Sequence, residues 1–395
     1  MPGGTEECGS SALKFLMKKK PNIWLHTSAL QIALISVSVL LITLSGAPAQ
    51  NQSEASWTTT GSMATDRYAH TATLLPLGKV LVAGGYSLHV GALRSAELYD
   101  PATGMWTATG DMTIERWYHT STLLPSGKVL VVAGADAHFN TLSSAELYDP
   151  ATGIWTRTGS LAIARAGFTA TLLLSGKVLV AGGSDNGELY SAELYDPVAG
   201  TWTKAGHLST ARDDHTATLL ADGRVLVAGG VTFQFTHELN NPELYDPASG
   251  TWTHTDKMDN ERGYTTATLL PSGAVLVAAG LGNHGTLGGA ELYDPLTGLW
   301  TPTGNLGHKR FDHSATLLTS GKVLVVGGFK GGMGALRSAE LYDPATGSWT
   351  GTAALAVRRF LHTATLLSSG KVLVAGGVGG DSLSSAELYD QGLGF

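Results

Sequence analysis

The sequence is nearly free of cysteine. Its single cysteine is Cys8, which lies in an N-terminal segment that we expect to be removed on export. The exported chain would then have no disulfide, no thiolate metal site and no cysteine nucleophile. Charged residues make up only 14% of the 395 residues, and no run of lysine and arginine occurs beyond the first twenty positions. The chain therefore lacks the basic patch typical of nucleic-acid binding, and we expect no nucleic-acid partner.

Long apolar runs are also scarce, and the one present is typical of an export signal. Lys18, Lys19 and Lys20 precede an uncharged, mainly apolar stretch over residues 30–44, and a small-x-small site follows at 47–49. The stretch is shorter than the roughly 20 residues that span a bilayer. We predict a signal peptide over residues 1–49, with Met17 as an alternative start and an uncleaved anchor as the alternative reading. The protein is then expected to be secreted, periplasmic or at the cell surface, and free of the membrane after cleavage.

Known catalytic motifs are missing from the sequence. It contains no His-Glu-x-x-His zinc motif and no Gly-x-Ser-x-Gly nucleophile elbow. Asp213, Asp214 and Asp312 are candidates for acid–base work, but the sequence does not fix the distances between them. We expect no cofactor, and a non-catalytic role is favoured over an enzymatic one.

Internal repeats dominate the rest of the chain. Three signatures recur seven times with a period of 47 to 50 residues. The tetrapeptide Glu-Leu-Tyr-Asp begins at Glu97, Glu146, Glu193, Glu243, Glu291, Glu340 and Glu387. Tryptophans recur at Trp57, Trp106, Trp155, Trp202, Trp252, Trp300 and Trp349, each ten residues before an arginine, at Arg67, Arg116, Arg165, Arg212, Arg262, Arg310 and Arg359.

One repeat, residues 67–109, is readily divided into four strands. Residues 70–75 and 79–83 are short apolar or β-branched runs, joined by a turn in which Gly78 supplies a positive φ. Residues 96–99 and 106–108 form two more, joined by an Asp-Pro-Ala-Thr-Gly turn. Four antiparallel strands per repeat of about 50 residues indicate a blade of a β-propeller. Seven repeats predict an all-β, seven-bladed propeller over residues 50–395.

The repeat resembles the Kelch family, in which an apolar strand ends in Gly-Gly and is followed by Tyr and Trp at fixed distances. Here the pattern is residues 80–85, Tyr99 and Trp106, while two blades have Ala133-Gly134 and Ala279-Gly280 in place of Gly-Gly. The resemblance, to secreted Kelch proteins of bacterial type, implies the propeller domain also found in galactose oxidase. It does not imply that enzyme's copper-radical site, because the exported chain lacks the cysteine that is crosslinked to tyrosine there.

The strand count predicts how the ring closes. The repeats begin with a tryptophan strand at 57–59 and end with the Glu-Leu-Tyr-Asp strand of Glu387. The two pair off only if the N-terminal strand completes the last blade, which also removes the open sheet edges. The predicted blades are 67–109, 116–158, 165–205, 212–255, 262–303, 310–352, and 359–390 with 57–60.

Topology places the repeated arginines and the variable loops between the second and third strands on one face of the ring. Three residues after the arginine lies His70, His119, His215, His313 or His362. These imidazoles could form a metal or anion site, or hydrogen-bond a neighbouring blade. The arginines could grip an acidic partner, or pair with the carboxylate of each repeat. The positions directly after the arginines break the repeat, with Tyr68, Trp117, Tyr118, Asp213, Asp214, Tyr264, Phe311, Asp312 and Phe360.

Variable residues on a rigid scaffold are the usual place for binding, so this face is the candidate site. The candidate ligand-binding residues are Arg67, Arg116, Trp117, Tyr118, His119, Arg212, Asp213, Asp214, His215, Arg310, Phe311, Asp312, His313, Arg359 and His362. The favoured function is a monomeric binding module for a protein or glycan. The alternatives are a carbohydrate-active enzyme acting at the channel mouth, as an epimerase, lyase or hydrolase, and a structural part of an envelope assembly.

Overall fold

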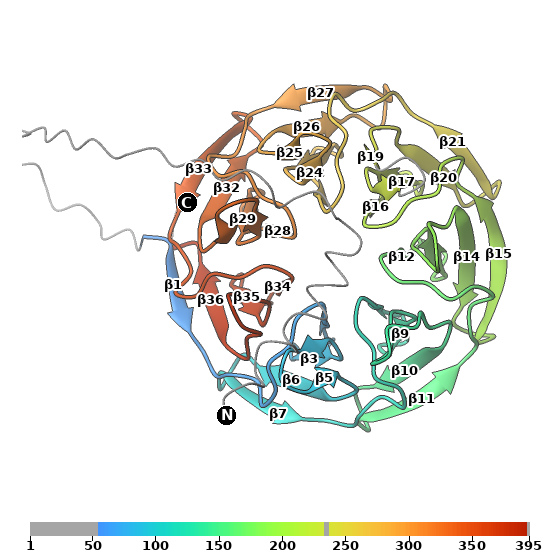
Figure 1. Cartoon of the computed structure of the whole chain (residues 1–395), viewed down its shortest axis with the longest axis vertical. Coiled ribbons are helices and arrows are strands. Elements are labelled where there is room, and N and C mark those ends of the chain that lie inside the picture. The colour runs from blue at the N-terminus through green and yellow to red at the C-terminus, as the bar shows by residue number, and fades with distance from the viewer. Residues whose placement is uncertain (1–53, 233–236, 393–395) are drawn as a thin grey trace, which may run out of the picture.

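The protein is a closed ring of seven four-stranded antiparallel sheets (Figure 1). In a propeller the innermost strands surround a central channel. The computed structural model describes residues 54–232 and 237–392, so the predicted signal peptide at 1–49 lies outside the described residues. Within the described ranges there is no helix that is long and apolar enough to cross a membrane. The prediction of a seven-bladed propeller is confirmed.

In six blades the strands run outward from the channel in chain order, and in the seventh the N-terminal strand of the chain is outermost. Blades 1 to 3 comprise β2 (Thr71–Leu74), β3 (Val80–Ala83), β6 (Ala96–Asp100) and β7 (Met105–Ala108); β8 (Thr120–Leu123), β9 (Val129–Val132), β10 (Ala145–Asp149) and β11 (Ile154–Thr158); and β12 (Thr169–Leu172), β13 (Val178–Ala181), β14 (Ser191–Asp196) and β15 (Thr201–His207). Blades 4 and 5 comprise β16 (Thr216–Leu219), β17 (Val225–Ala228), β20 (Glu243–Asp246) and β21 (Thr251–His254); and β22 (Thr266–Leu269), β23 (Val275–Ala278), β26 (Ala290–Tyr293) and β27 (Trp300–Thr303).

The last two blades follow the same plan. They comprise β28 (Ser314–Leu317), β29 (Val323–Val326), β32 (Ala339–Asp343) and β33 (Ser348–Thr352); and β34 (Thr363–Leu366), β35 (Val372–Ala375), β36 (Ala386–Asp390) and β1 (Ser56–Thr59). Four loops between the second and third strands of a blade carry a small hairpin. These hairpins pair β4 (Tyr86–Ser87) with β5 (Gly91–Ala92), β18 (Val231–Thr232) with β19 (His237–Glu238), β24 (Leu281–Gly282) with β25 (Gly285–Thr286), and β30 (Phe329–Lys330) with β31 (Gly334–Ala335).

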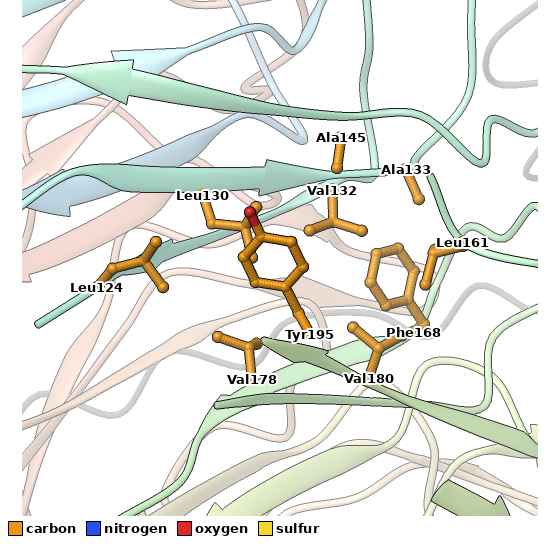
Figure 2. Close-up of a cluster of buried hydrophobic side chains, with 10 residues drawn as sticks. All are labelled: Leu124, Leu130, Val132, Ala133, Ala145, Leu161, Phe168, Val178, Val180 and Tyr195. Atoms are coloured by element: carbon orange, nitrogen blue, oxygen red, sulfur yellow. The ribbon is translucent and has the colours of Figure 1, made fainter. Parts of the chain in front are cut away.

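The core lies between adjacent blades, and the second strand of each blade is buried on both faces. In β9, Leu130 and Val132 pack against Val178 and Val180 of blade 3, as Figure 2 shows. The intervening Val129 and Val131 belong to the cluster shared with blade 1. Because alternate side chains of a strand point to opposite faces, a strand between two neighbours must be apolar throughout. Fully burying a Val or Leu side chain stabilises the folded state by about 1.5–3 kcal/mol.

The N-terminal strand closes the ring as predicted. β1 pairs antiparallel with β36, and Trp57 lies opposite Tyr389 in the register. The Trp57 indole donates a hydrogen bond to the Ala353 carbonyl at 2.7 Å. Trp106 donates the equivalent bond to Gly61 at 2.8 Å, so the closing strand makes the same contact to the preceding blade as the strand of a continuous blade.

Candidate functional site

The seven repeated arginines are fully buried, and each forms an ion pair with the glutamate of Glu-Leu-Tyr-Asp in its own blade. In blade 1, Arg67 lies 2.8 Å from Glu97 and donates to the carbonyls of Gly84 and Ser95. Glu97 also accepts a hydrogen bond from the Ala64 backbone at 2.8 Å. The buried pair and these hydrogen bonds hold the start of the innermost strand, the loop and the third strand together. Each arginine thus pairs with the carboxylate of its own repeat, which was one of the two alternatives from the sequence. This pairing leaves the arginines without surface for a ligand.

The five repeated histidines link neighbouring blades. Each Nε2 shares a hydrogen bond with the hydroxyl of the first residue of the preceding blade's innermost strand. The pairs are His70–Thr363 and His119–Thr71 at 3.0 Å, and His215–Thr169, His313–Thr266 and His362–Ser314 at 2.9 Å. Burial disfavours the imidazolium form, and a nearby arginine adds to the effect, so the pKa values of His119, His215 and His362 fall to about 3.

Close packing within each blade explains the second glycine of each Gly-Gly pair. Gly85 has a φ of 97°, and a Cβ placed there would lie 2.7 Å from the Cβ of His70 and 2.8 Å from the Tyr68 carbonyl oxygen. No side chain fits in that space. The glycine thus keeps the loop against the start of the innermost strand.

Around the mouth of the channel, the backbone forms a second ring. The residue two places after each arginine has a left-handed φ between 48° and 67°, at Ala69, Tyr118, Gly167, Asp214, Tyr264, Asp312 and Leu361. Backbone hydrogen bonds link these residues across six of the seven junctions between blades: Tyr118 donates to Ala69, Asp214 to Gly167, Tyr264 to Asp214, Asp312 to Tyr264, Leu361 to Asp312 and Ala69 to Leu361. The rigid ring therefore fixes the positions from which these side chains leave the backbone.

Four of these side chains are polar, and they place hydroxyl and carboxylate groups at the channel mouth. Tyr118, Asp214, Tyr264 and Asp312 are half-buried. Burial raises the pKa of the Tyr118 hydroxyl well above its usual value, and the nearby Asp312 and Asp214 carboxylates raise it further. The pKa of Tyr264 is raised for the same reasons, and its hydroxyl donates a hydrogen bond to Asp214. Neutral hydroxyls beside carboxylates can donate and accept hydrogen bonds with a polyhydroxyl ligand.

An aromatic cluster supports this polar group on one side of the channel. Trp117 is fully buried, and its ring centroid lies 5.2 Å from Tyr86, 4.9 Å from Tyr118 and 5.7 Å from Phe139. Tyr68 joins the cluster, 6.5 Å from Trp117. The repeat-breaking aromatics of blades 1 and 2 thus pack the loops against the rim.

The structure separates the candidate residues into two groups. Ten are buried and present almost no surface to a ligand: Arg67, Arg116, Trp117, His119, Arg212, Asp213, His215, Arg310, His313 and Arg359. Five are partly exposed: Tyr118, Asp214, Phe311, Asp312 and His362. Tyr264, which occupies the position of Tyr118 in blade 5, is also partly exposed and joins this second group. The signal for Tyr264 in the sequence is that it breaks the repeat at a position directly after the arginine motif.

A metal site is not supported by the donor set. Within the described residues, no group of three or more histidine, cysteine, aspartate and glutamate side chains is arranged to hold a metal ion. The five repeated imidazoles each use Nε2 in a contact between blades. The imidazoles around the channel are therefore committed to contacts between blades and do not fit a copper ion.

Comparison with known proteins agrees with this architecture. The Kelch motif family model matches residues 165–209 and 312–353, which correspond to blades 3 and 6. The chain is a Kelch-repeat β-propeller. No curated protein matches its sequence.

Among solved structures, the Kelch propeller is similar to a fungal alcohol oxidase of the AA5 family, solved in complex with copper. The TM-score is 0.70 at 20% sequence identity, and the match covers 85% of this chain and 76% of the oxidase chain. At this identity the similarity establishes a common fold. The oxidase activity belongs to that protein, and the fold alone does not carry it over to this one.

Proposed function

We propose that this Kelch propeller is an exported, non-catalytic binding module that holds a glycan at the mouth of its channel. The observation that carries the proposal is the group Tyr118, Asp214, Tyr264 and Asp312, held in fixed directions by the backbone ring. Binding sites combine apolar walls with a few polar groups at set positions. Half-buried hydroxyl and carboxylate oxygens beside aromatic rings suit the hydroxyls of a sugar better than a flat protein surface.

The test is a glycan array on wild-type protein, followed by titration of the strongest glycan. Asp214→Asn and Tyr264→Phe together should weaken binding at least tenfold. Asparagine tolerates the left-handed backbone at position 214, where φ is 49°. The control is Asp222→Asn in the same blade, in the turn between β16 and β17 on the opposite face. An array without binders, or equal binding by all three proteins, would contradict the proposal.

A carbohydrate-active enzyme is the second candidate. The specific observation in its favour is that two carboxylates, Asp214 and Asp312, both act on the Tyr118 and Tyr264 hydroxyls and so lie close together at the channel mouth. Paired carboxylic groups can act as acid and base on a sugar. Turnover of any glycan in a panel, lost in Asp312→Asn, would favour this candidate over simple binding.

A further inference from the structure

An open groove of about 650 Å³ lies between blades 6 and 7, and its lining residues include none of the four polar residues of the channel mouth. Its polar lining residues are His308, Arg337, Ser338 and Arg358, and the remainder are alanine, leucine, valine and glycine. No acidic residue is among the described residues that line it. The volume falls in the range of about 300–1,000 Å³ that is typical of ligand sites.

Both arginines of the groove are exposed and available to a ligand. Arg358 donates from Nε to the Gly379 carbonyl at 2.8 Å, which orients the guanidinium and leaves its terminal nitrogens for other partners. Within the described parts of the chain, neither Arg337 nor Arg358 forms an ion pair. Two buried glutamates lie behind the lining residues, and each is neutralised by its own arginine. Glu340 is paired with Arg310 at 2.6 Å and lies 3.5 Å from His308. Glu387 is paired with Arg359 at 2.8 Å and accepts hydrogen bonds from the Ala356 and Val357 backbone. The groove therefore keeps its positive charge.

The other six junctions between blades provide an internal comparison. At the positions equivalent to Arg337 and Arg358 they have Arg94 with Glu115, Ser143 with Ala164, Tyr190 with Ala211, Asn240 with Glu261, Gly288 with Lys309, and Ser384 with Asp66. The groove between blades 4 and 5, of about 530 Å³, is lined by Glu238 and Glu261 as well as Lys257. Two basic residues thus meet at one junction of the seven, in a chain whose net charge is −7. The repeat itself does not require them.

We propose that the groove between blades 6 and 7 binds an extended acidic segment of a partner protein. Guanidinium groups bind carboxylates through two parallel hydrogen bonds. In an extended peptide, alternate side chains point to opposite sides, so acidic residues reach the arginines while small apolar residues face the wall of Ala335, Leu336 and Val357. No aromatic ring lines this groove, which distinguishes it from the channel mouth and disfavours a sugar. The site is separate from the glycan site and does not depend on it.

The test is fluorescence anisotropy with a labelled octapeptide of alternating glutamate and leucine. Wild-type protein should bind it, and binding should weaken as salt is raised from 50 to 500 mM because the charges are exposed. Arg337→Gln with Arg358→Gln should weaken binding about tenfold or more, equivalent to about 1.4 kcal/mol. Arg358→Glu should do the same, and it is expected to fold because blade 5 has Glu261 at that position.

Matched controls separate this site from general charge effects. Arg94→Gln alters the equivalent position of blade 1, where Arg94 lies 3.6 Å from Asp111, and it should leave binding unchanged. The Asp214→Asn and Tyr264→Phe variant should also bind the peptide normally, so failure of the glycan proposal leaves this one intact. The proposal is overturned if the peptide does not bind, if a glutamine–leucine peptide binds equally well, or if the double variant retains wild-type affinity. The proposal is also overturned if inorganic sulfate or anionic vesicles, at matched charge, displace the labelled peptide as well as an unlabelled copy of the peptide does.

Discussion

Acidification should destabilise the Kelch propeller well above the pH at which its carboxylates titrate. His119, His215 and His362 are neutral in the folded state, with pKa values of about 3, against about 6.5 in an unfolded chain. Between these values the unfolded state binds more protons. The contribution of these histidines to the free energy of unfolding is therefore fully present above pH 6.5, and it is lost as the pH falls below 6.5.

The size of the effect follows from the number of histidines. Each histidine lowers the free energy of unfolding by about 1.4 kcal/mol for every pH unit below 6.5. Between pH 7.5 and 5.5 only the last unit counts, so the three histidines together lower it by about 4 kcal/mol. The pKa values of His70 and His313 are lowered as well, and they act in the same direction. The pKa of the exposed His89 is raised by Asp66 and Asp381, so it opposes the trend, weakly because solvent screens it. A loss of this size is a large part of the 5–15 kcal/mol typical of a folded domain.

The assay is urea unfolding followed by tryptophan fluorescence at pH 7.5, 6.5, 5.5 and 4.5. His119→Phe provides the matched variant, because blade 3 already has Phe168 at that position. It should reduce the slope of unfolding free energy against pH below 6.5, whatever its effect at pH 7.5. An unfolding free energy that changes by less than about 1 kcal/mol between pH 7.5 and 5.5 would refute the assignment of buried neutral imidazoles.

Three further perturbations test the architecture by chemical or thermal unfolding. Glu146→Gln leaves Arg116 buried without its counter-ion and should lower the free energy of unfolding by about 3–5 kcal/mol. Lys79→Gln removes the surface pair with Asp100 and should lower it by less than about 1 kcal/mol. Gly85→Ala should destabilise by about 1–3 kcal/mol because the new Cβ meets His70; a neutral result would contradict the close packing. Deleting residues 56–60 removes β1 and should lower the unfolding temperature, and an unchanged temperature would contradict closure by that strand.

Much of the fold was predictable because the sequence repeats itself. Seven Trp and seven Glu-Leu-Tyr-Asp strands leave one unpaired strand at each end, and only the pairing of Trp57 with Tyr389 resolves both. The strand bounds differ by about a residue, as with 70–75 predicted and Thr71–Leu74 observed. The difference arises because His70 points into the contact between blades instead of joining the ladder.

The candidate site was predictable only in part. A residue repeated in register gives the same sequence signal whether it binds a ligand or a neighbouring blade, so Arg212 and His215 could not be assigned until their partners, Glu243 and Thr169, were known. Residues that break the repeat were the better indicators, and Asp214 is one of them. The groove was missed because its arginines, 337 and 358, come from different blades and meet only across a junction. Comparison of equivalent positions across the seven junctions could have found it.

The most direct test of the binding function is a crystal structure of the protein with the glycan that binds best on the array. We predict that the sugar lies at the channel mouth, with hydroxyls hydrogen-bonded to Asp214 and Tyr264 and within contact of Tyr118. A glycan seated in the groove between blades 4 and 5, or on the opposite face near Asp222, would contradict the account.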